Sequence, residues 1–139
     1  MEFKHEDELR QFENCPPTDA TPVDDEVRFR FVFEDIADGR NFLPVAIKNP
    51  QREFETDAQR CDSFSLSMFD QEANAVEFFA RLQRRHKKAK KTIGTHVAAG
   101  TLSVDDGVAS ETRVDGHLSF WVSAEADLPA KFVITNELN

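Results

Sequence analysis

The sequence predicts an α+β domain: a mainly antiparallel sheet of about six or seven strands, with one principal helix at about residues 70–90 packed on it. Three observations lead to this prediction. Apolar residues alternate with polar ones in several short segments, which is the period of a half-buried strand. A single segment has apolar residues at helical spacing over several turns. Two Asp-Gly pairs, at 106–107 and 115–116, indicate hairpin turns late in the chain.

The N-terminal residues 1–26 are acidic and contain three prolines in the run CPPTDATPVDD. Prolines favour an extended path, so we expect an arm here and a single domain over residues 27–139. Ahead of the prolines, Leu9 and Phe12 lie three positions apart in HEDELRQFE. This spacing allows a short N-terminal helix.

Residues 27–33, VRFRFVF, give the clearest strand, because apolar residues occupy its alternate positions: Val27, Phe29, Phe31 and Phe33. Residues 42–48, FLPVAIK, predict a second and weaker strand, in which the proline requires a sheet edge or a strand start. Residues 63–69, SFSLSMF, alternate apolar residues with serines and predict a third strand.

The principal helix is predicted to begin after Asp70, a good N-cap residue. Its apolar stripe is formed by Ala75, Val76, Phe79 and Leu82. From Gln83 to Lys91 only Ala89 is apolar. We therefore expect the helix to dock through its first turns and to extend into solvent at its C-terminal end.

Four more strands are expected to follow one another as an antiparallel run, at residues 96–104, 108–114, 117–123 and 131–135. Gly100, inside the first of them, indicates a bulge or a close backbone approach. The third has two distinct faces. Leu118, Phe120 and Val122 lie on one face, and His117, Ser119 and Trp121 lie on the other.

Charge is distributed unevenly along the chain, whose formal net charge is −9. Seven of the 17 basic residues lie within residues 81–91, here called the basic segment: Arg81, Arg84, Arg85, Lys87, Lys88, Lys90 and Lys91. Two interpretations stay open. These side chains bind anions such as nucleic-acid phosphates, or they form a solvated helix end that complements the helix dipole. The acidic remainder of the chain disfavours nucleic acid as a partner.

The two cysteines, Cys15 and Cys61, are expected to be free thiols in a cytoplasmic protein, because the first residues do not resemble an export signal. A disulfide between them is the alternative. No segment is apolar enough to span a membrane, so no membrane partner is expected. Neither a His-Glu-x-x-His nor a Cys-x-x-Cys pattern occurs, and no metal is predicted. Oligomeric state is left open.

Signatures of catalysis are missing, since the sequence contains no phosphate-binding loop, dinucleotide fingerprint or nucleophile elbow. The expected function is therefore a small, non-catalytic binding or accessory domain that needs no cofactor and has a protein or polyanion as partner. Trp121 is the candidate contact residue, because exposed tryptophans are often hot spots. The alternative places Trp121 in the core. His96 and His117 could each serve in acid–base chemistry.

One arrangement resembles the ADP-ribosyltransferase-like fold. A strand with arginine in RFRF precedes a serine-bearing strand, SFSLSMF, which leads into the helix DQEANAVEFFARL, over about residues 27–82. The resemblance implies an NAD-consuming enzyme or a degenerate relative, in which Arg30 and Ser65 or Ser67 would hold NAD. The family also has an acid or another polar residue on a late strand. Glu111 is the only acid in the middle of one, and His96 is a further candidate.

Overall fold

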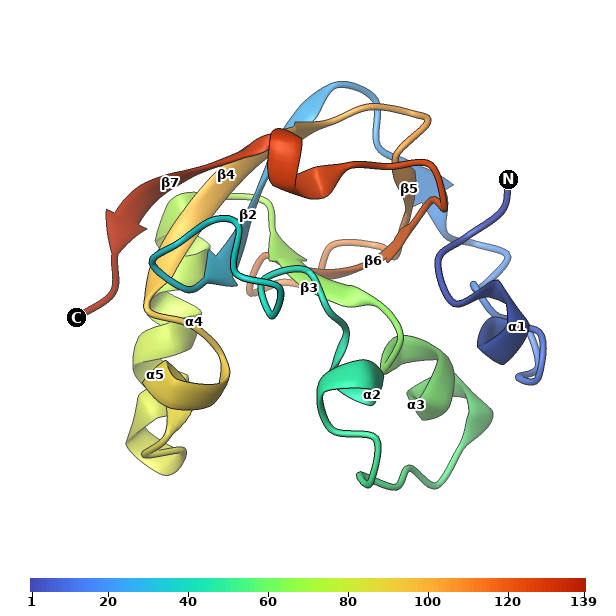
Figure 1. Cartoon of the computed structure of the whole chain (residues 1–139), viewed down its shortest axis with the longest axis horizontal. Helices are drawn as coiled ribbons and strands as arrows, with labels where there is room; N and C mark the ends of the chain where they lie inside the picture. Colours follow the sequence, from blue (N-terminus) through green and yellow to red (C-terminus); the bar gives the residue numbers. More distant parts are fainter.

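Seven strands form one antiparallel sheet in the computed structural model, which describes all 139 residues (Figure 1). The strands are β1 (Thr21–Pro22), β2 (Glu26–Val32), β3 (Leu66–Phe69), β4 (His96–Leu102), β5 (Gly107–Ala109), β6 (His117–Val122) and β7 (Phe132–Glu137). The helices are α1 (Glu6–Leu9), α2 (Val45–Lys48), α3 (Asp57–Asp62), α4 (Glu72–Arg85) and α5 (Ala89–Thr92), with a 3-10 turn, η1, at Leu128–Ala130. The predicted α+β class is confirmed.

The spatial order of the strands is β1-β5-β6-β3-β2-β4-β7, so neighbours in the sheet are seldom neighbours in the chain. The expected consecutive run of late strands is therefore wrong. β4 pairs with β2 over seven residues, not with β5. In the first Asp-Gly turn, between β4 and β5, the carboxylate of Asp106 accepts a hydrogen bond from the backbone N–H of Ser103. A side chain therefore closes this turn, and the two strands beside it do not form a hairpin. The second turn does join a hairpin, β5–β6, and Gly116 has a φ of 86° there.

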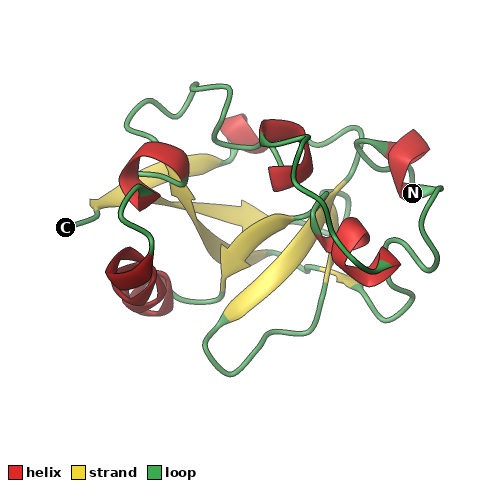
Figure 2. Ribbon diagram, turned by 90° about the horizontal axis from the view of Figure 1, so that it is seen from below, coloured by secondary structure: helices red, strands yellow, loops and turns green.

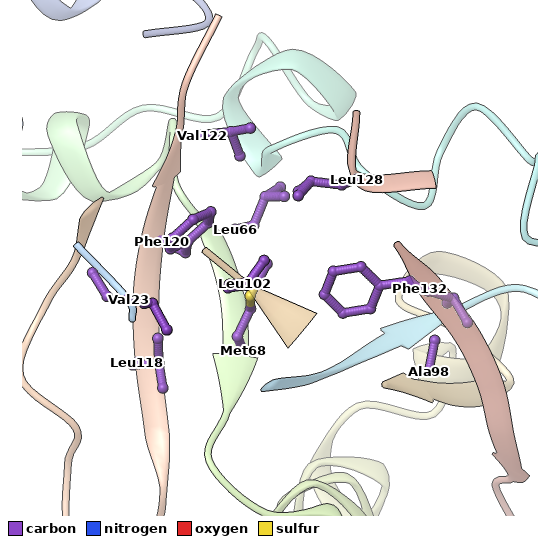
Figure 3. Packing of buried hydrophobic residues seen from close by; sticks show 12 residues of the cluster. Val23, Leu66, Met68, Ala98, Leu102, Leu118, Phe120, Val122, Leu128 and Phe132 are labelled. Carbon is purple, nitrogen blue, oxygen red and sulfur yellow. The ribbon is translucent and has the colours of Figure 1, made fainter. Parts of the chain in front are cut away.

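Strand alternation divides the core between the two faces of the sheet. Leu118, Phe120 and Val122 point into the largest cluster of buried residues, which Figure 3 shows from close by. His117, Ser119 and Trp121 lie on the opposite face, as predicted. That opposite face is covered in two places. One is a cluster beneath α4 and α5, and the other is a cluster beneath α1 and α3.

The principal helix is confirmed as α4, and Phe79 on its inner side is 1% exposed. It ends at Arg85, several residues earlier than expected. The chain then turns at His86 and forms α5, because Ala89 is buried in the same cluster as Phe79. The basic segment is thus folded over two helices and does not project as one helix.

Two predicted strands differ from the structure for local reasons. The segment 42–48 contains α2, whose N-cap is Pro44. Proline has no N–H to donate to a ladder, yet it suits the start of a helix. β3 begins only at Leu66, because the hydroxyls of Ser63 and Ser65 donate to carbonyl oxygens of α3. Gly100 does mark a close approach: a Cβ there would lie 2.6 Å from the Phe132 ring.

The first 26 residues pack along the sheet, with the two termini at opposite ends of the molecule (Figure 2). Leu9 is 1% exposed, and β1 pairs with β5. Cys15 and Cys61 form a disulfide, so the expectation of free thiols is wrong. Sequence spacing could not reveal that the arm passes α3. Disulfides persist mainly in oxidising compartments, and the cytoplasmic location stays a prediction.

Trp121 belongs to the core and is not a partner contact. Its side chain is 3% exposed, and its Nε1 donates to the carbonyl oxygen of Cys61 at 3.1 Å. The expectation of an exposed hot spot is wrong and the alternative, a core position, is confirmed, because α1 and α3 cover this end of the sheet. None of the helices combines the length and the apolar composition that a membrane crossing would require.

We expect the Cys15–Cys61 bond, which closes a loop of 46 residues, to contribute about 4 kcal/mol to the free energy of unfolding, because it restricts the unfolded chain. Urea unfolding with and without reductant measures this contribution. The Cys15→Ser/Cys61→Ser protein is the control and should not respond to reductant. Two reactive thiols per chain in the unreduced, unfolded protein would contradict the bond.

Candidate functional site

A cleft of about 1150 Å³ opens on the face of the sheet that carries α3 and α4. Side chains from α2 and α3 line one side of it, and Phe78, Leu82 and Ile93 line the other. The same two groups of helices stand apart in Figure 1, with β3 between them. Residues of the N-terminal arm and of the loop that follows β5 complete the walls. The cleft is thus the part of this face that neither group of helices covers.

Most of the residues suggested by the ADP-ribosyltransferase-like resemblance line this cleft: Arg30, Ser65, Ser67 and Glu111. His96 does not. It begins β4, and its Nδ1 lies 2.8 Å from the hydroxyl oxygen of Thr95. The cations of the basic segment also lie outside the lining of the cleft. The structure therefore brings together most residues of the ADP-ribosyltransferase-like hypothesis, while the cations of the anion-binding hypothesis form a separate surface.

Arg30 occupies the place where two central strands diverge. β2 and β3 share only one register pair, Phe29 with Phe69. Beyond that pair, the Nη1 of Arg30 donates to the carbonyl oxygen of Ser67 at 2.8 Å, and its Nε donates to the carbonyl oxygen of Asn41 at 2.8 Å. The guanidinium therefore bridges the gap between the strands from within the sheet.

The positive charge of Arg30 has no acidic partner. Burial lowers the pKa of Arg30 to about 10, so the side chain remains charged at neutral pH. No carboxylate forms an ion pair with it, and its Nη2 donates to no protein atom. A buried charge without a counter-charge is costly. The free donors of this guanidinium are therefore suited to an anion in the cleft.

Asn41 fixes the loop that holds Arg30 and was not identified from the sequence. Its side chain is 1% exposed, and its Oδ1 accepts from the backbone N–H of Phe33 at 2.7 Å. Its Nδ2 donates to the carbonyl oxygens of Asp35 and Ile36. The side-chain amide of Asn41 thus holds the chain after β2, and its backbone carbonyl oxygen accepts the hydrogen bond that orients Arg30. An asparagine in a polar loop gives no sequence signal for this role.

Lys48, at the end of α2, places a second cation in the cleft. Its Nζ lies 3.5 Å from the carbonyl oxygen of Thr92, on the opposite wall. Desolvation lowers the pKa of Lys48, and the guanidinium groups of Arg30 and Arg40 lower it further. Lys48 forms no ion pair with a carboxylate. Two cations without acidic partners therefore act on the same part of the cleft.

The polar floor of the cleft is formed by β3 and β6. Ser67 and Ser119 are register partners, so their side chains share one face. The Ser119 hydroxyl donates to Oδ1 of Asp62 at 2.5 Å, and Asp62 itself lines the cleft. Glu111 is not on a strand, because β5 ends at Ala109. The expected late-strand position of Glu111 is therefore wrong, and the strand next to β3 carries serine and histidine instead.

His117 forms a hydrogen-bonded pair with Ser67, since Nε2 of the ring and the serine Oγ are 3.0 Å apart. Burial lowers the pKa of His117 most, and the nearby Arg113 guanidinium lowers it further, so the ring is neutral at pH 7. Nδ1 is buried without a partner. Orphaned buried N–H groups are rarer than orphaned acceptors. The ring proton therefore belongs on Nε2, which donates to Ser67 and leaves the serine hydroxyl proton free for a ligand.

Aromatic rings form the apolar side of the cleft. Phe31, Phe69 and Phe78 all line it, and the Phe69 and Phe78 ring centroids are 5.1 Å apart. Phe78 also stacks on the His117 ring at 5.9 Å. Phe31 and Phe69 are buried, so a flat aromatic ligand group would meet the partly buried Phe78 ring here, near the serine hydroxyl.

No cluster of three or more histidine, cysteine, aspartate or glutamate side chains is arranged to hold a metal ion. The chain matches no family model, no curated protein and no solved structure among the known proteins with which it was compared. The site is therefore interpreted from its own geometry.

We predict that His117 is neutral at pH 7 with its proton on Nε2. Correlation of the ring nitrogens with the ring protons by NMR reports this tautomer directly. In the Ser67→Ala protein, Nε2 loses its acceptor, and the preference for this tautomer should weaken. A ring that carries its proton on Nδ1 in the wild-type protein would contradict the assignment.

Proposed function

We propose that the cleft binds NAD and that the chain is an NAD-consuming enzyme of the ADP-ribosyltransferase-like kind. One observation carries the proposal. Arg30 is a buried cation with no acidic partner, it lines the cleft, and its Nη1 donates to the backbone carbonyl oxygen of Ser67. This is the combination of an arginine strand and a serine strand that the sequence resemblance suggested.

The two unpaired cations fit the anionic centre of a dinucleotide. A pyrophosphate carries two negative charges, and Arg30 and Lys48 supply two positive ones. Arginine offers planar, bidentate donors to phosphate oxygens, and lysine acts as a mobile point charge. Acidic side chains also line the cleft, at Glu13, Asp19, Asp62 and Glu111. They belong to other segments than the two cations, so phosphates are expected at the Arg30 and Lys48 end.

The remaining features of the cleft fit the nicotinamide half of NAD. The partly buried Phe78 ring offers an apolar face to a flat ring, and the Ser67 hydroxyl offers a donor to a carboxamide or ribose oxygen. Typical ligand pockets measure about 300–1000 Å³. At about 1150 Å³, the cleft has room for a dinucleotide.

Asp62 is the residue proposed to support bond cleavage. When the bond between the ribose and nicotinamide breaks, nicotinamide leaves with the bonding electrons, and positive charge develops on the ribose. A carboxylate stabilises this charge and accepts a proton from the water or other acceptor that adds to the ribose carbon. Ser119 and Ser65 hold Asp62 by hydrogen bonds to its side chain and backbone.

Millimolar NAD is expected to stabilise the protein. A ligand at 100 times its dissociation constant adds about 2.7 kcal/mol to the free energy of unfolding, which corresponds to a rise of about 8 °C in Tm for a chain of this length. Arg30→Gln and Lys48→Met should each reduce the rise in Tm. Arg28→Gln is the matched control, because Arg28 lies on the same strand and pairs with Glu26 outside the cleft. An unchanged Tm in the wild-type protein at millimolar NAD would contradict the proposal.

Asp62→Asn should lower the rate of nicotinamide release from NAD by about 100-fold or more, because the variant loses the base but keeps the shape of the side chain. Asp57→Asn is the control, since Asp57 lies on the same helix, pairs with Arg60, and does not line the cleft. Release can be followed by chromatography. If the wild-type protein binds NAD without releasing nicotinamide, the catalytic part of the proposal fails and the chain is a non-catalytic NAD-binding domain.

A further inference from the structure

The basic segment forms a compact charged surface that the NAD proposal does not use. The end of α4, the turn after it and α5 together expose six cations: Arg84, Arg85, Lys87, Lys88, Lys90 and Lys91. The break in the helix at His86 brings both helix ends into this one corner. The cations thus lie at two helix ends that meet at this turn, not along one projecting helix.

These six cations have no acidic partners within the protein. The four ion pairs of the structure involve other cations, namely Arg28, Arg40, Arg60 and Lys131. Along the chain, no acidic residue occurs between Glu77 and Asp105. A role in neutralising the protein's own acidic residues through ion pairs is therefore not seen.

The chemistry of the surface favours a polyphosphate over a protein. Protein interfaces need an apolar or aromatic centre. The exposed large apolar side chains of this chain all lie elsewhere, and Ala89, between the lysines, is buried. A nucleic-acid backbone is recognised by charge alone, with release of counterions. No aromatic side chain is exposed beside the cations to stack on bases, so such binding would not depend on base sequence.

We infer that the basic segment binds the phosphate backbone of a nucleic-acid strand next to the cleft. Leu82 and Ile93, which flank the six cations in the chain, both line the cleft, and Lys48 reaches Thr92 from the opposite wall. The cations are thus the outer surface of one cleft wall. The acidic remainder of the protein opposes such binding, but at cellular salt its repulsion is screened over about 8–10 Å.

Fluorescence anisotropy of a labelled single-stranded DNA of about 20 nucleotides tests this inference. Binding is expected at about 50 mM salt, and it should weaken between about tenfold and a few hundredfold at about 200 mM as three to six contacts are screened. Lys87→Glu/Lys88→Glu should lower the affinity at least tenfold. Sequence changes in the DNA should have little effect.

Lys4→Glu/Arg10→Glu is the matched control, because it makes the same change in net charge at two exposed cations outside the basic segment. It should retain most of the affinity. Arg30→Gln should also bind DNA, which separates this inference from the NAD proposal. No binding at about 50 mM salt, or equal losses in the two charge-reversed proteins, would overturn the inference. Binding of polyglutamate but not of DNA would overturn it in favour of an acidic protein partner.

Discussion

The sheet of this protein depends on a guanidinium group placed where backbone pairing stops. β2 and β3 are central strands, yet they share a single register pair. Arg30 replaces the missing ladder with hydrogen bonds to Asn41 and Ser67. Because a side chain spans the gap, the two halves of the sheet can diverge while the buried carbonyl groups remain satisfied. The same divergence opens the floor of the cleft.

The cleft also follows from the way in which one face of the sheet is covered. Phe79 and Ala89 anchor α4 and α5 over β2 and β4. Leu9, Cys61 and Trp121 anchor the arm and α3 over β6. Neither apolar cluster extends over Ser67, which is exposed, because a serine hydroxyl provides no apolar area for a helix to bury. The position of the site is therefore set by where the apolar surface of this face ends.

Local sequence patterns predicted most of the helices and strands. The order of the strands and the roles of several site residues depend on contacts between distant segments, which the sequence does not reveal. Alternation identified β2, β4 and β6, and helical spacing placed Phe79 in the core. Strand order is set by pairing between segments far apart in the chain, so the link between β4 and β2 could not be read from either segment. In the site, Arg30 and Ser67 were predicted through a resemblance. Asn41 and Asp62 took their roles from contacts that no local motif marks. His117 was a candidate from the sequence, but its contact with Ser67 could not be predicted from either segment.

Two polar groups that line or adjoin the cleft carry a cost that apolar packing would avoid. A stable core avoids unpaired buried polar atoms, yet here the buried Nδ1 of His117 lacks a partner and the Arg30 guanidinium lacks a counter-charge. Each costs free energy in the unliganded protein. Apolar residues at both positions would avoid that cost, but an apolar residue in place of Arg30 would provide no donor to a ligand, and one in place of His117 would not orient the Ser67 hydroxyl. The sequence thus retains polar groups where packing alone would remove them, and an anionic ligand with a hydrogen-bond acceptor is what would satisfy both Arg30 and the Ser67 hydroxyl that His117 orients.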